Sequence, residues 1–345
     1  MPKVSIIVLN WNGKKFLKNC LDSLQKLTYT SIEIIVVDNN SKDGSLEFVK
    51  KNYPKIILVE NKENYGFAKG NNIGYKKAKG EYILILNNDT VVTPDFLNPL
   101  VETFKKDSHI GCLQPQIRLL ENKNMLDGVG AFLTSTGFLY HFGYLKVKNR
   151  DIYNKRMKIF SAKGACMLLN RKAIEKVGLF DEDFFIFFEE TDLCFRLWLA
   201  GFTVVYEPES IIYHIGGADT TSSKSYQVER RAYLSLRNMF CSYLKNFGTI
   251  NLLVILPIFI FLQVCLVSYY LITLRIKLVI TVFKAFLWNI VNIEKTLKKR
   301  SIIQHKIRTF SDTKLNEEII QNPGFNYYYY LLIGKLSFYK DKLYI

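Results

Sequence analysis

The chain opens with short apolar runs separated by polar turns and helical patterns. Residues 4–9, 32–37 and 56–59 are almost wholly apolar, as expected for strands that are buried on both faces. Between the first two runs, apolar residues recur at helical spacing over residues 14–26, and Asp43 is expected to cap a second helix. This order of elements predicts a parallel sheet with helices on its faces, and therefore an α/β fold.

A fourth apolar run, residues 82–86, leads into Asn87, Asn88 and Asp89. The carboxyl ends of the strands form the ligand crevice of an α/β sheet, and Asp38 ends the second strand in the same way. A carboxylate at the end of a buried strand is costly unless something compensates its charge. We therefore predict that both carboxylates face one crevice and that Asp89 meets a metal or a cationic ligand there. The alternative is a polar turn without a ligand.

A glycine- and asparagine-rich stretch, residues 64–74, precedes that strand with the sequence NYGFAKGNNIG. It lacks the G-K-[ST] of a phosphate-binding loop and does not open the first βα turn, which excludes a dinucleotide fingerprint. Glycines are costly to order unless the backbone must approach something closely. The stretch is interpreted either as part of a ligand site or as a connection into a helix that ends near Ala78.

Residues 179–201 combine six acidic residues with six phenylalanines. A helix is expected from Glu189 to Ala200, with Gly201 just after its end. Glu189 and Glu190 would lie in its first turn, where the helix dipole favours the ionised carboxylate by roughly 0.3–1 kcal/mol each. An ionised carboxylate at a crevice is what a general base requires, although capping and solvation alone remain the alternative.

The remaining pattern of the first 241 residues is less regular. His214 follows an apolar run and precedes Gly216 and Gly217, which suits a flexible loop over a site, although a lone histidine is more often packed or on the surface. Short strands with loops at residues 127–144 are candidate walls for the substrate. Further strands are expected at 112–119, 160–169 and 203–206. Further helices are expected to start at Thr93, to run from Asn170 to Gly178 and to cover 226–244. In the last helix, the side chains of Arg230, Arg231 and Arg237 would face either a phosphate or water.

Charge and hydropathy separate the last third from the rest. The chain of 345 residues has a net charge of +16, and from Ser242 onward 14 Lys and Arg stand against 5 Asp and Glu, which gives +9. The six cysteines form no C-x-x-C pair, so reduced, packed thiols in a cytosolic compartment are expected. No secretory signal is expected either, because the first residues run directly into a strand pattern.

Residues 250–272 carry no charge over 23 positions, which is long enough for a transmembrane helix that tolerates Pro257. A second run, 278–291, is amphipathic, and three placements remain open: it spans, re-enters or lies in the interface. The alternative for both runs is a pair of core helices in a second soluble domain. The basic residues of 295–300 fit an anionic cytoplasmic leaflet, and the tyrosines at 327–330 are a candidate interfacial anchor.

The expected parts are therefore a catalytic domain at 1–241, hydrophobic membrane-associated helices at 242–292, and a basic, aromatic-rich tail at 293–345. Membrane lipid is an expected partner of the C-terminal region. Nucleic acid is not, because the charge lies beside hydrophobic segments and no nucleic-acid motif is present.

Six stretches, in this order, resemble family 2 glycosyltransferases with the GT-A fold. The nearest branch is the rhamnosyltransferase-like one that builds bacterial surface polysaccharides. The stretches are VSIIVLNWNG, VVDNNSKDGS, NYGFAKGNNIG, LNNDT, FDEDFFIFFEETDLCFR and YHIGG. Each is weakly specific alone, but six in order over about residues 1–240 are highly specific. The resemblance implies a nucleotide-diphospho-sugar transferase with a Rossmann-like, mostly parallel sheet, here followed by the C-terminal hydrophobic helical membrane segment.

The resemblance also assigns roles on the donor side. Asp38 would bind the pyrimidine ring of a nucleotide-sugar, with Asn10 nearby, and Asn71 and Asn88 would line the donor site. The expected donor is a UDP- or dTDP-sugar, with dTDP-L-rhamnose as one candidate.

The metal is implied by the same resemblance. The stretch 87–89 stands where the family has its D-x-D motif, and its first position is Asn87 here. Asp89 would therefore be the main acidic ligand of Mg²⁺ or Mn²⁺, and His214 would complete the site. A hard cation held by a carboxylate neutralises charge on a leaving diphosphate.

The base is expected in the family's E-D-x-D-L block, which here reads Glu189-Glu190 with Asp192 retained. Glu190 would take the proton of an acceptor hydroxyl in an inverting single displacement. The expected acceptor is a saccharide or a polyprenyl-linked glycan, at the cytoplasmic face of the cell membrane. Because Asn87 and Glu190 depart from the family pattern, a non-catalytic nucleotide-sugar-binding scaffold of a polysaccharide assembly complex remains the alternative.

Overall fold

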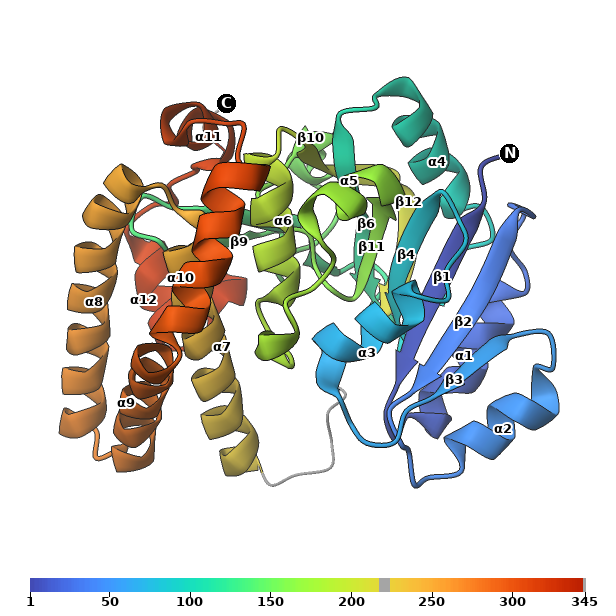
Figure 1. The fold of residues 1–345 in the computed structure, drawn as a ribbon, viewed down its shortest axis with the longest axis horizontal. Coiled ribbons are helices and arrows are strands. Elements are labelled where there is room, and N and C mark those ends of the chain that lie inside the picture. The colour runs from blue at the N-terminus through green and yellow to red at the C-terminus, as the bar shows by residue number, and fades with distance from the viewer. Residues whose placement is uncertain (217–223, 344–345) are drawn as a thin grey trace.

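The computed structural model describes residues 1–216 and 224–343, with the side chains of 224–227 left out. A central sheet carries helices on both faces, and the C-terminal helices gather beyond one end of it (Figure 1). The strands are β1 (Val4–Asn10), β2 (Ile32–Asp38), β3 (Ile57–Glu60), β4 (Tyr82–Asn87), β5 (Thr90–Val92), β6 (Ile110–Leu119), β7 (Leu126–Gly128), β8 (Gly130–Leu133), β9 (Leu139–Phe142), β10 (Met157–Lys158), β11 (Cys166–Asn170) and β12 (Thr203–His214). The helices are α1 (Lys14–Leu24), α2 (Ser45–Asn52), α3 (Gly66–Tyr75), α4 (Leu97–Lys106), α5 (Arg171–Val177), α6 (Glu189–Leu199), α7 (Lys224–Asn246), α8 (Thr249–Ile272), α9 (Ile276–Val291), α10 (Ile293–Ile302), α11 (Asp312–Ile319) and α12 (Asn326–Leu332).

The main sheet has the order β10-β12-β6-β11-β4-β1-β2-β3. Strands β3, β2, β1 and β4 are parallel, which confirms the expected βαβ opening. Strand β11 then runs antiparallel between β4 and β6, and β5, β7 and β10 also pair in antiparallel fashion. Strands β6 and β12 are again parallel to each other. The sheet is therefore mixed, and the expectation of a mostly parallel sheet is correct for β3-β2-β1-β4 and for β6-β12 but not for β11 and the short strands. The register sets Asn10 opposite Asp38 and Leu9 opposite Asn87, so these strand ends are level with one another.

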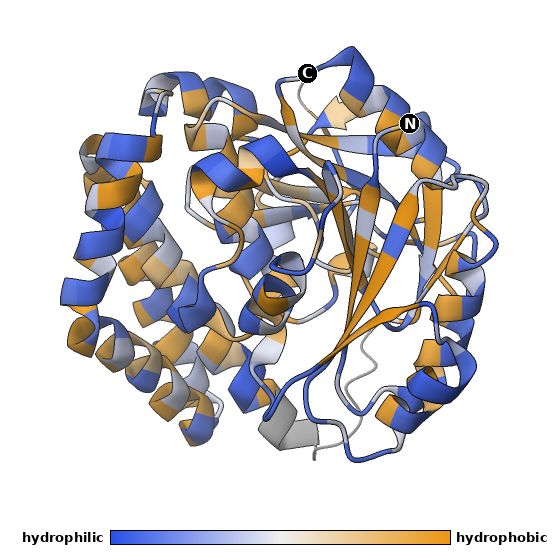
Figure 2. Cartoon of the chain, turned by 45° about the vertical axis from the view of Figure 1, so that its right-hand side comes forward, coloured by the Kyte–Doolittle hydropathy of each residue, from blue (hydrophilic) through white to orange (hydrophobic). Residues whose placement is uncertain are grey.

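Two hydrophobic cores cover the two faces of the sheet. Successive side chains of a strand point to opposite faces, so Ile6 and Val8 pack with residues of α1 and α4, whereas Ile7 packs with residues of α3. Figure 2 shows the central strands almost continuously hydrophobic. A Cβ atom on Gly74 would lie 2.6 Å from Cγ2 of Ile7, so a glycine is needed for α3 to lie this close to the sheet.

Several elements differ from the expected boundaries. The glycine-rich stretch forms helix α3 itself, because Gly66, Gly70 and Gly74 let the helix approach its neighbours. Helix α4 begins at Leu97 rather than next to Thr93, and β11 keeps only the second half of the run 160–169. Strand β12 extends to His214, so this histidine ends a strand and is held in register with β5. The predicted loop beyond it includes Gly217, which lies outside the described residues.

The C-terminal region packs closely against the first domain. Helix α7 runs across the expected boundary at 241, and residues from all three expected parts share one hydrophobic core. Asp341 is buried and accepts hydrogen bonds from the Tyr153 hydroxyl and the Gly143 N–H, each 2.8 Å long. Tyr327 is buried as well and donates to the carbonyl of Leu139 at 2.8 Å. The prediction of an interfacial anchor is therefore wrong for Tyr327, which is a core residue.

Five cysteines are buried free thiols, as expected, and Cys265 on α8 is exposed. Among the described residues, α8 is the single helix that is long and apolar enough to cross a membrane on its own. Helix α9 and the helical segment 293–307, which includes α10, are long and apolar enough only when taken together, and they are bent by 63° relative to each other.

Candidate active site

Three polar side chains form a connected group at the carboxyl edge of the sheet. Asn10 Nδ2 donates to Asp38 Oδ1 at 2.9 Å, and Asn88 Nδ2 donates to Asn10 Oδ1 at 2.7 Å. Asp38 also accepts from the Ser41 N–H at 2.8 Å, which ties the strand end to the following turn. Gly13 is required beside them, because a Cβ there would lie 2.0 Å from Asn88 Nδ2 and 2.6 Å from Asn10 Oδ1.

The space next to Asp38 is an open pocket of about 480 Å³. Its walls come from the turn after β2, the start of α2 and the end of β3, with Asp38, Ser41, Glu47 and Asn61 among the lining residues. Asn71 lies apart from these walls, fully buried in α3, and its Oδ1 has no hydrogen-bond partner.

Asp89 and His214 come together because their strands pair. Strand β5 runs antiparallel to the end of β12, with Thr90 opposite His214, and the Ile215 N–H donates to the Asp89 carbonyl at 3.1 Å. This register places His214 Nε2 3.2 Å from Asp89 Oδ1, with both side chains about nine-tenths buried. The two candidate metal ligands thus lie side by side.

Asp127, on β7, holds the other nitrogen of that imidazole. Its Oδ2 lies 2.7 Å from His214 Nδ1 and 2.5 Å from Lys163 Nζ. Burial would raise the pKa of Asp127, but the histidine and the lysine outweigh it and lower the pKa to about 2. Burial likewise lowers the pKa of His214, but its two carboxylate partners raise it to about 9. The described residues therefore contain a line of contacts that is buried from Asp89 to Asp127 and ends at the half-buried Lys163.

The side chains of Asp89 and His214 can be compared with the ligands that a divalent cation requires. Oδ1 of Asp89 is buried and has no hydrogen-bond partner among the described residues apart from its ion-pair contact with His214 Nε2, so its lone pairs become available once the imidazole gives up its proton. Two neighbouring ligands of one octahedral ion, each about 2.1 Å from the metal, lie about 3 Å apart, close to the spacing of Asp89 Oδ1 and His214 Nε2. Asp127 fixes the imidazole through Nδ1, as carboxylates do for metal-binding histidines. Asp89 and His214 thus supply two ligands of the kind that such an ion takes. Among the described residues, no group of three or more His, Cys, Asp or Glu side chains is placed to hold a metal ion, so the remaining ligands would have to come from elsewhere.

Glu190 lies in the first turn of α6, next to the segment that contains Lys163. A Cβ atom on Gly164 would be 3.8 Å from Cδ of Glu190, so the side chain packs directly over that glycine. Burial raises the pKa of Glu190 to about 6, with Lys163 acting in the opposite direction. Glu189 is more deeply buried, and burial together with its neighbour raises its pKa well above the usual range. Glu190 is thus the carboxylate of this pair that is ionised near neutral pH.

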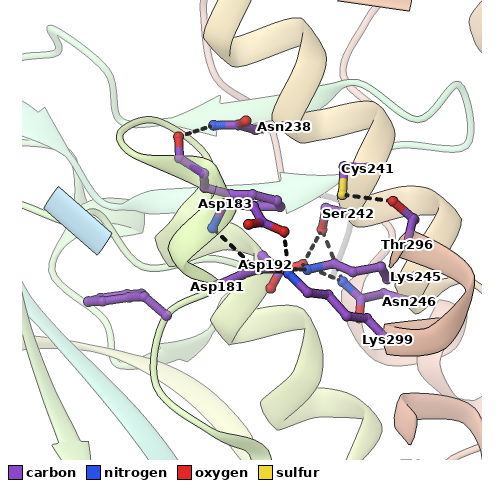
Figure 3. Close-up of polar contacts among 12 residues, drawn as sticks. Asp181, Asp183, Asp192, Asn238, Cys241, Ser242, Lys245, Asn246, Thr296 and Lys299 are labelled. Carbon is purple, nitrogen blue, oxygen red and sulfur yellow. Dashed lines mark hydrogen bonds and ion pairs between the residues drawn. The ribbon is translucent and has the colours of Figure 1, made fainter. Parts of the chain in front are cut away.

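Asp192 does not reach the crevice. It is fully buried and accepts hydrogen bonds from Ser242 and Asn246, both at 2.8 Å, while Arg196 Nε lies 3.0 Å from its other oxygen. Lys245 Nζ lies 3.1 Å from it and 2.5 Å from Asp181 (Figure 3). A carboxylate enclosed in this way does not fit the catalytic role expected for Asp192, because no oxygen faces a substrate.

The basic run 295–300 forms several ion pairs and hydrogen bonds within the protein. Lys295 and Lys299 form ion pairs with Asp183, and Lys299 also contacts Asp181 (Figure 3). Arg300 donates to the carbonyls of Leu244 and Phe247. Lys299 and Arg300 are thus largely engaged within the protein, whereas Lys295 and Lys298 remain exposed, so contact of this run with an anionic leaflet stays a prediction for those two lysines.

A strained loop leads into Glu190. Phe185, Phe187 and Phe188 all have positive φ, at 61°, 72° and 71°, a conformation that costs of order 1–3 kcal/mol for each such residue. Asn238 on α7 holds the loop by donating to the carbonyls of Phe184, Ile186 and Phe187 over 2.9, 3.1 and 2.7 Å.

The same loop closes over the start of α3. The carbonyl of Phe185 accepts from the N–H groups of Phe67 and Ala68, at 2.6 and 3.1 Å. A Cβ atom on Gly66 would lie 2.5 Å from that oxygen, which explains a glycine in this motif.

Asp127 and Lys163 were not among the residues predicted from the sequence. Both stand in stretches without a motif, and only the pairing of β7 with β6, and of β6 with β12, brings Asp127 to His214. The arginines of α7 were expected to face a phosphate or water. Arg237 instead donates to the carbonyls of Asp183 and Phe184, and Arg230 lies over the ring of Phe185.

The family model for glycosyl transferase family 2 matches residues 5–178, about half of the chain. The chain belongs to this family. It is therefore a glycosyltransferase, as the motifs predicted. The matched region contains Asp38, Asp89, Asp127 and Lys163 and ends before Glu190.

Several curated relatives of this chain carry names that refer to glycan synthesis. The low-salt glycan biosynthesis hexosyltransferase Agl10 of Haloferax volcanii is 25% identical over 70% of this chain and 75% of its own length. The O-antigen biosynthesis protein RfbC of Myxococcus xanthus is 28% identical over 67% of this chain. The poly-beta-1,6-N-acetyl-D-glucosamine synthase of Staphylococcus aureus is 26% identical over 59% of it. The chain spans only 19% of RfbC and 48% of the synthase.

Solved structures confirm the fold. A mannosyltransferase of Pyrobaculum calidifontis, in complex with GDP-mannose and Mn²⁺, matches with a TM-score of 0.52 and 18% identity over 88% of this chain and 81% of its own. GalNAc-T7 with UDP, GalNAc and Mn²⁺ matches with a TM-score of 0.55 and 20% identity over 70% of this chain and 47% of its own. The transferase thus has the GT-A fold with a mixed central sheet.

Proposed function

We propose that this transferase is an inverting hexosyltransferase that moves a sugar from a nucleotide-diphosphate donor to a saccharide or lipid-linked acceptor. The observation that carries the proposal is the line of contacts from Asp89 through His214 and Asp127 to Lys163, with Glu190 beside it. The names of Agl10, RfbC and the staphylococcal synthase support a role in the biosynthesis of a surface polysaccharide. Structures of the same fold that hold UDP or GDP-mannose support a nucleotide-sugar donor.

The donor would occupy the edge of the sheet between Asp38 and Asp89. Asp38, held by Asn10, would accept a hydrogen bond from the single ring N–H of a uracil or thymine base. Asn88 donates a hydrogen bond to Asn10, and this contact would hold the Asn88 side chain beside the strand ends that line the donor site. Asn71 would be a donor contact only through its one unpaired buried oxygen, which lies apart from the pocket at Asp38. UDP- and dTDP-sugars, with dTDP-L-rhamnose among them, are the candidates we would test first.

Asp89 and His214 would hold the divalent cation, Mg²⁺ or Mn²⁺. When bound, it neutralises negative charge on the leaving diphosphate. The imidazole ligand favours Mn²⁺ over Mg²⁺, because nitrogen ligands suit the softer ion. Asp127 would orient His214 and does not itself touch the donor.

Glu190 would act as the general base. Its carboxylate takes the proton of the acceptor hydroxyl, whose oxygen forms a bond to the anomeric carbon as the bond from that carbon to the diphosphate breaks. A base works best when its pKa lies near the operating pH, and burial brings Glu190 to about 6. Lys163 lies near enough to offset part of the effect of burial on the pKa of Glu190. Asp192 would act as a positioning residue that anchors α6 to α7.

The exposed apolar side chains of α8 and α9 support membrane association of the C-terminal region. With nucleotide-sugars made in the cytoplasm, the enzyme would work at the cytoplasmic face of the cell membrane. A polyprenyl-linked glycan is then an attractive acceptor, because it is confined to the same surface.

The test is a screen of the purified full-length chain against UDP-, dTDP- and GDP-sugars. Donor hydrolysis and transfer are followed with Mn²⁺, with Mg²⁺ and with a chelator, for the wild type and for Glu190→Gln. We expect metal-dependent turnover with at least one donor, and its loss in the variant. Donor binding by calorimetry without any turnover would instead support a non-catalytic nucleotide-sugar-binding scaffold.

A further inference from the structure

Helices α8 and α9 expose many large apolar side chains. On α8, Leu253, Phe261 and Ile272 are 70%, 65% and 82% exposed. On α9, the exposed positions Ile276, Ile280, Phe283, Leu287 and Ile290 follow one stripe. Monomeric soluble proteins rarely expose contiguous apolar patches of this kind, and such patches mark surfaces that interact with another protein or a membrane.

The inner face of α8 is already occupied by the protein. Ile255, Phe259 and Gln263, spaced four residues apart, are buried. The ring of Phe259 lies 6.0 Å from that of Phe138, in the turn between β8 and β9, and 5.9 Å from that of Tyr243 on α7. The middle of α8 is therefore packed on the catalytic domain.

Polar contacts accompany α8 at both ends. At its start, the Gly248 N–H donates to Asp312 at 3.2 Å, and Asn251 donates to Asn316 at 3.0 Å. Just beyond its end, Lys277 lies 3.8 Å from Glu229 of α7. Folded parts of the molecule thus lie beside the start, the middle and the end of the helix.

This arrangement conflicts with a membrane crossing. A spanning helix needs about 20 residues within a hydrocarbon layer about 30 Å thick. If α8 crossed, the catalytic domain behind Phe259 and the charged start of α7 would have to enter that layer, and buried charges there are very costly. The outward face alone can meet lipid while the inner face stays on the protein.

Helix α9 has the composition of an interfacial helix. Its buried side packs on α7, where Asn289 Nδ2 donates to the carbonyl of Arg237 at 3.1 Å. Lys277 and Lys284 are exposed near its apolar stripe. Apolar residues flanked by lysines favour a helix lying in the headgroup region of an anionic bilayer.

We propose that α8 and α9 lie flat in the plane of an anionic lipid surface and that α8 does not cross the membrane. The inference rests on the proposed membrane association and deepens it. The same packing connects the lipid-facing helices to α7, whose Asn238 holds the loop before Glu190.

The experiment measures the depth of single labels in the full-length chain. A fluorophore is attached to a cysteine at position 253, 261 or 272, in a Cys265→Ser background that removes the exposed native thiol. The protein is mixed with vesicles of phosphatidylcholine, with or without phosphatidylglycerol, that carry nitroxide quenchers near the headgroup or near the chain ends. A label at Lys50, on the exposed side of α2, is the matched control that stays unquenched.

Flat docking predicts quenching by the shallow nitroxide at all three positions. It also predicts about 30-fold weaker binding after Lys277→Gln and Lys284→Gln together. Deep quenching at 261 with shallow quenching at 253 and 272 would show a crossing and overturn the proposal, as would the absence of binding to either vesicle. Donor hydrolysis is measured on the same samples, so failure of the docking proposal is separate from failure of the transferase assignment.

Discussion

Nε2 of His214 lies 3.2 Å from Oδ1 of Asp89, and that buried oxygen has no other hydrogen-bond partner among the described residues. Asp89→Asn removes the charge while keeping the shape of the side chain. We expect metal-dependent turnover to fall by more than about 100-fold, beyond the 10–100-fold typical for loss of a group that only orients a ligand. Calorimetry with Mn²⁺ should show a parallel loss of affinity. Full activity in the variant would remove Asp89 from the metal site.

Asp127 offers a second test of the same site. Asp127→Asn weakens the hydrogen bond to His214 Nδ1 and leaves Lys163 without its carboxylate. We expect Mn²⁺ affinity to fall by about 10–100-fold, with part of the activity recovered at high metal concentration. Asp151→Asn, at an exposed position, is the control and should behave as the wild type. If both variants bind Mn²⁺ equally well, Asp127 does not orient a ligand.

Glu190 gives the reaction its expected pH dependence. A base must be deprotonated to accept a proton, and burial raises the pKa of Glu190 to about 6. The rate should therefore fall about tenfold for each pH unit below about 6 and level off above it. Rate profiles at saturating donor and metal measure this midpoint. Glu190→Gln should abolish the profile together with the activity, and an unchanged profile would assign the base elsewhere.

The sequence predicted the parts of this site that follow local patterns. Asp38 and Asp89 could be placed at one edge because consecutive parallel strands end together, and Glu190 because a helix start is readable from its neighbours. Asp127 could not be found, since it reaches His214 through a long-range register between β7, β6 and β12.

The contacts of Asp192 and of the basic run at 295–300 could not be predicted from the sequence either. From the sequence alone, a carboxylate in a motif, such as Asp192, is expected to face a ligand. A lysine that follows an apolar helix, such as Lys299, is expected to face solvent or lipid. Only tertiary packing shows that Lys245 and Lys299 neutralise the acidic loop from inside (Figure 3).

Asn238 is expected to position Glu190 through the loop before α6. Asn238→Ala removes hydrogen bonds to three carbonyls, so the positive φ of Phe187 and Phe188 is no longer enforced. We expect kcat to fall by as much as about 100-fold, since small displacements of a catalytic group have such effects, while KM for the donor is unchanged. The midpoint of the pH profile should also move, which a merely structural role would not cause. Asn292→Ala, which removes only a contact to the Trp288 carbonyl one turn away, is the control.

Lys245 is expected to matter for stability rather than for the reaction itself. Its ammonium group is buried between Asp181 and Asp192, whose pKa values it holds below their usual range against the opposing effect of burial. Lys245→Met keeps most of the volume but leaves two buried carboxylates without this partner. Breaking a buried pair in this way lowers the free energy of unfolding by about 3–5 kcal/mol. Lys298→Met, at an exposed lysine, should cost under about 1 kcal/mol.

The effect of Lys245→Met should depend on pH in a defined direction. Carboxyls with a lowered folded-state pKa contribute stability above their unfolded pKa, and this contribution is lost as the pH falls through the folded value. Without the lysine, the buried carboxyls take up protons at a higher pH, which removes their uncompensated charge. The gap in stability between wild type and variant should therefore be widest near neutral pH and narrow in acid. Urea denaturation across that range measures it, and a gap that is constant or widens in acid would show that Lys245 does not act by compensating these two carboxylates.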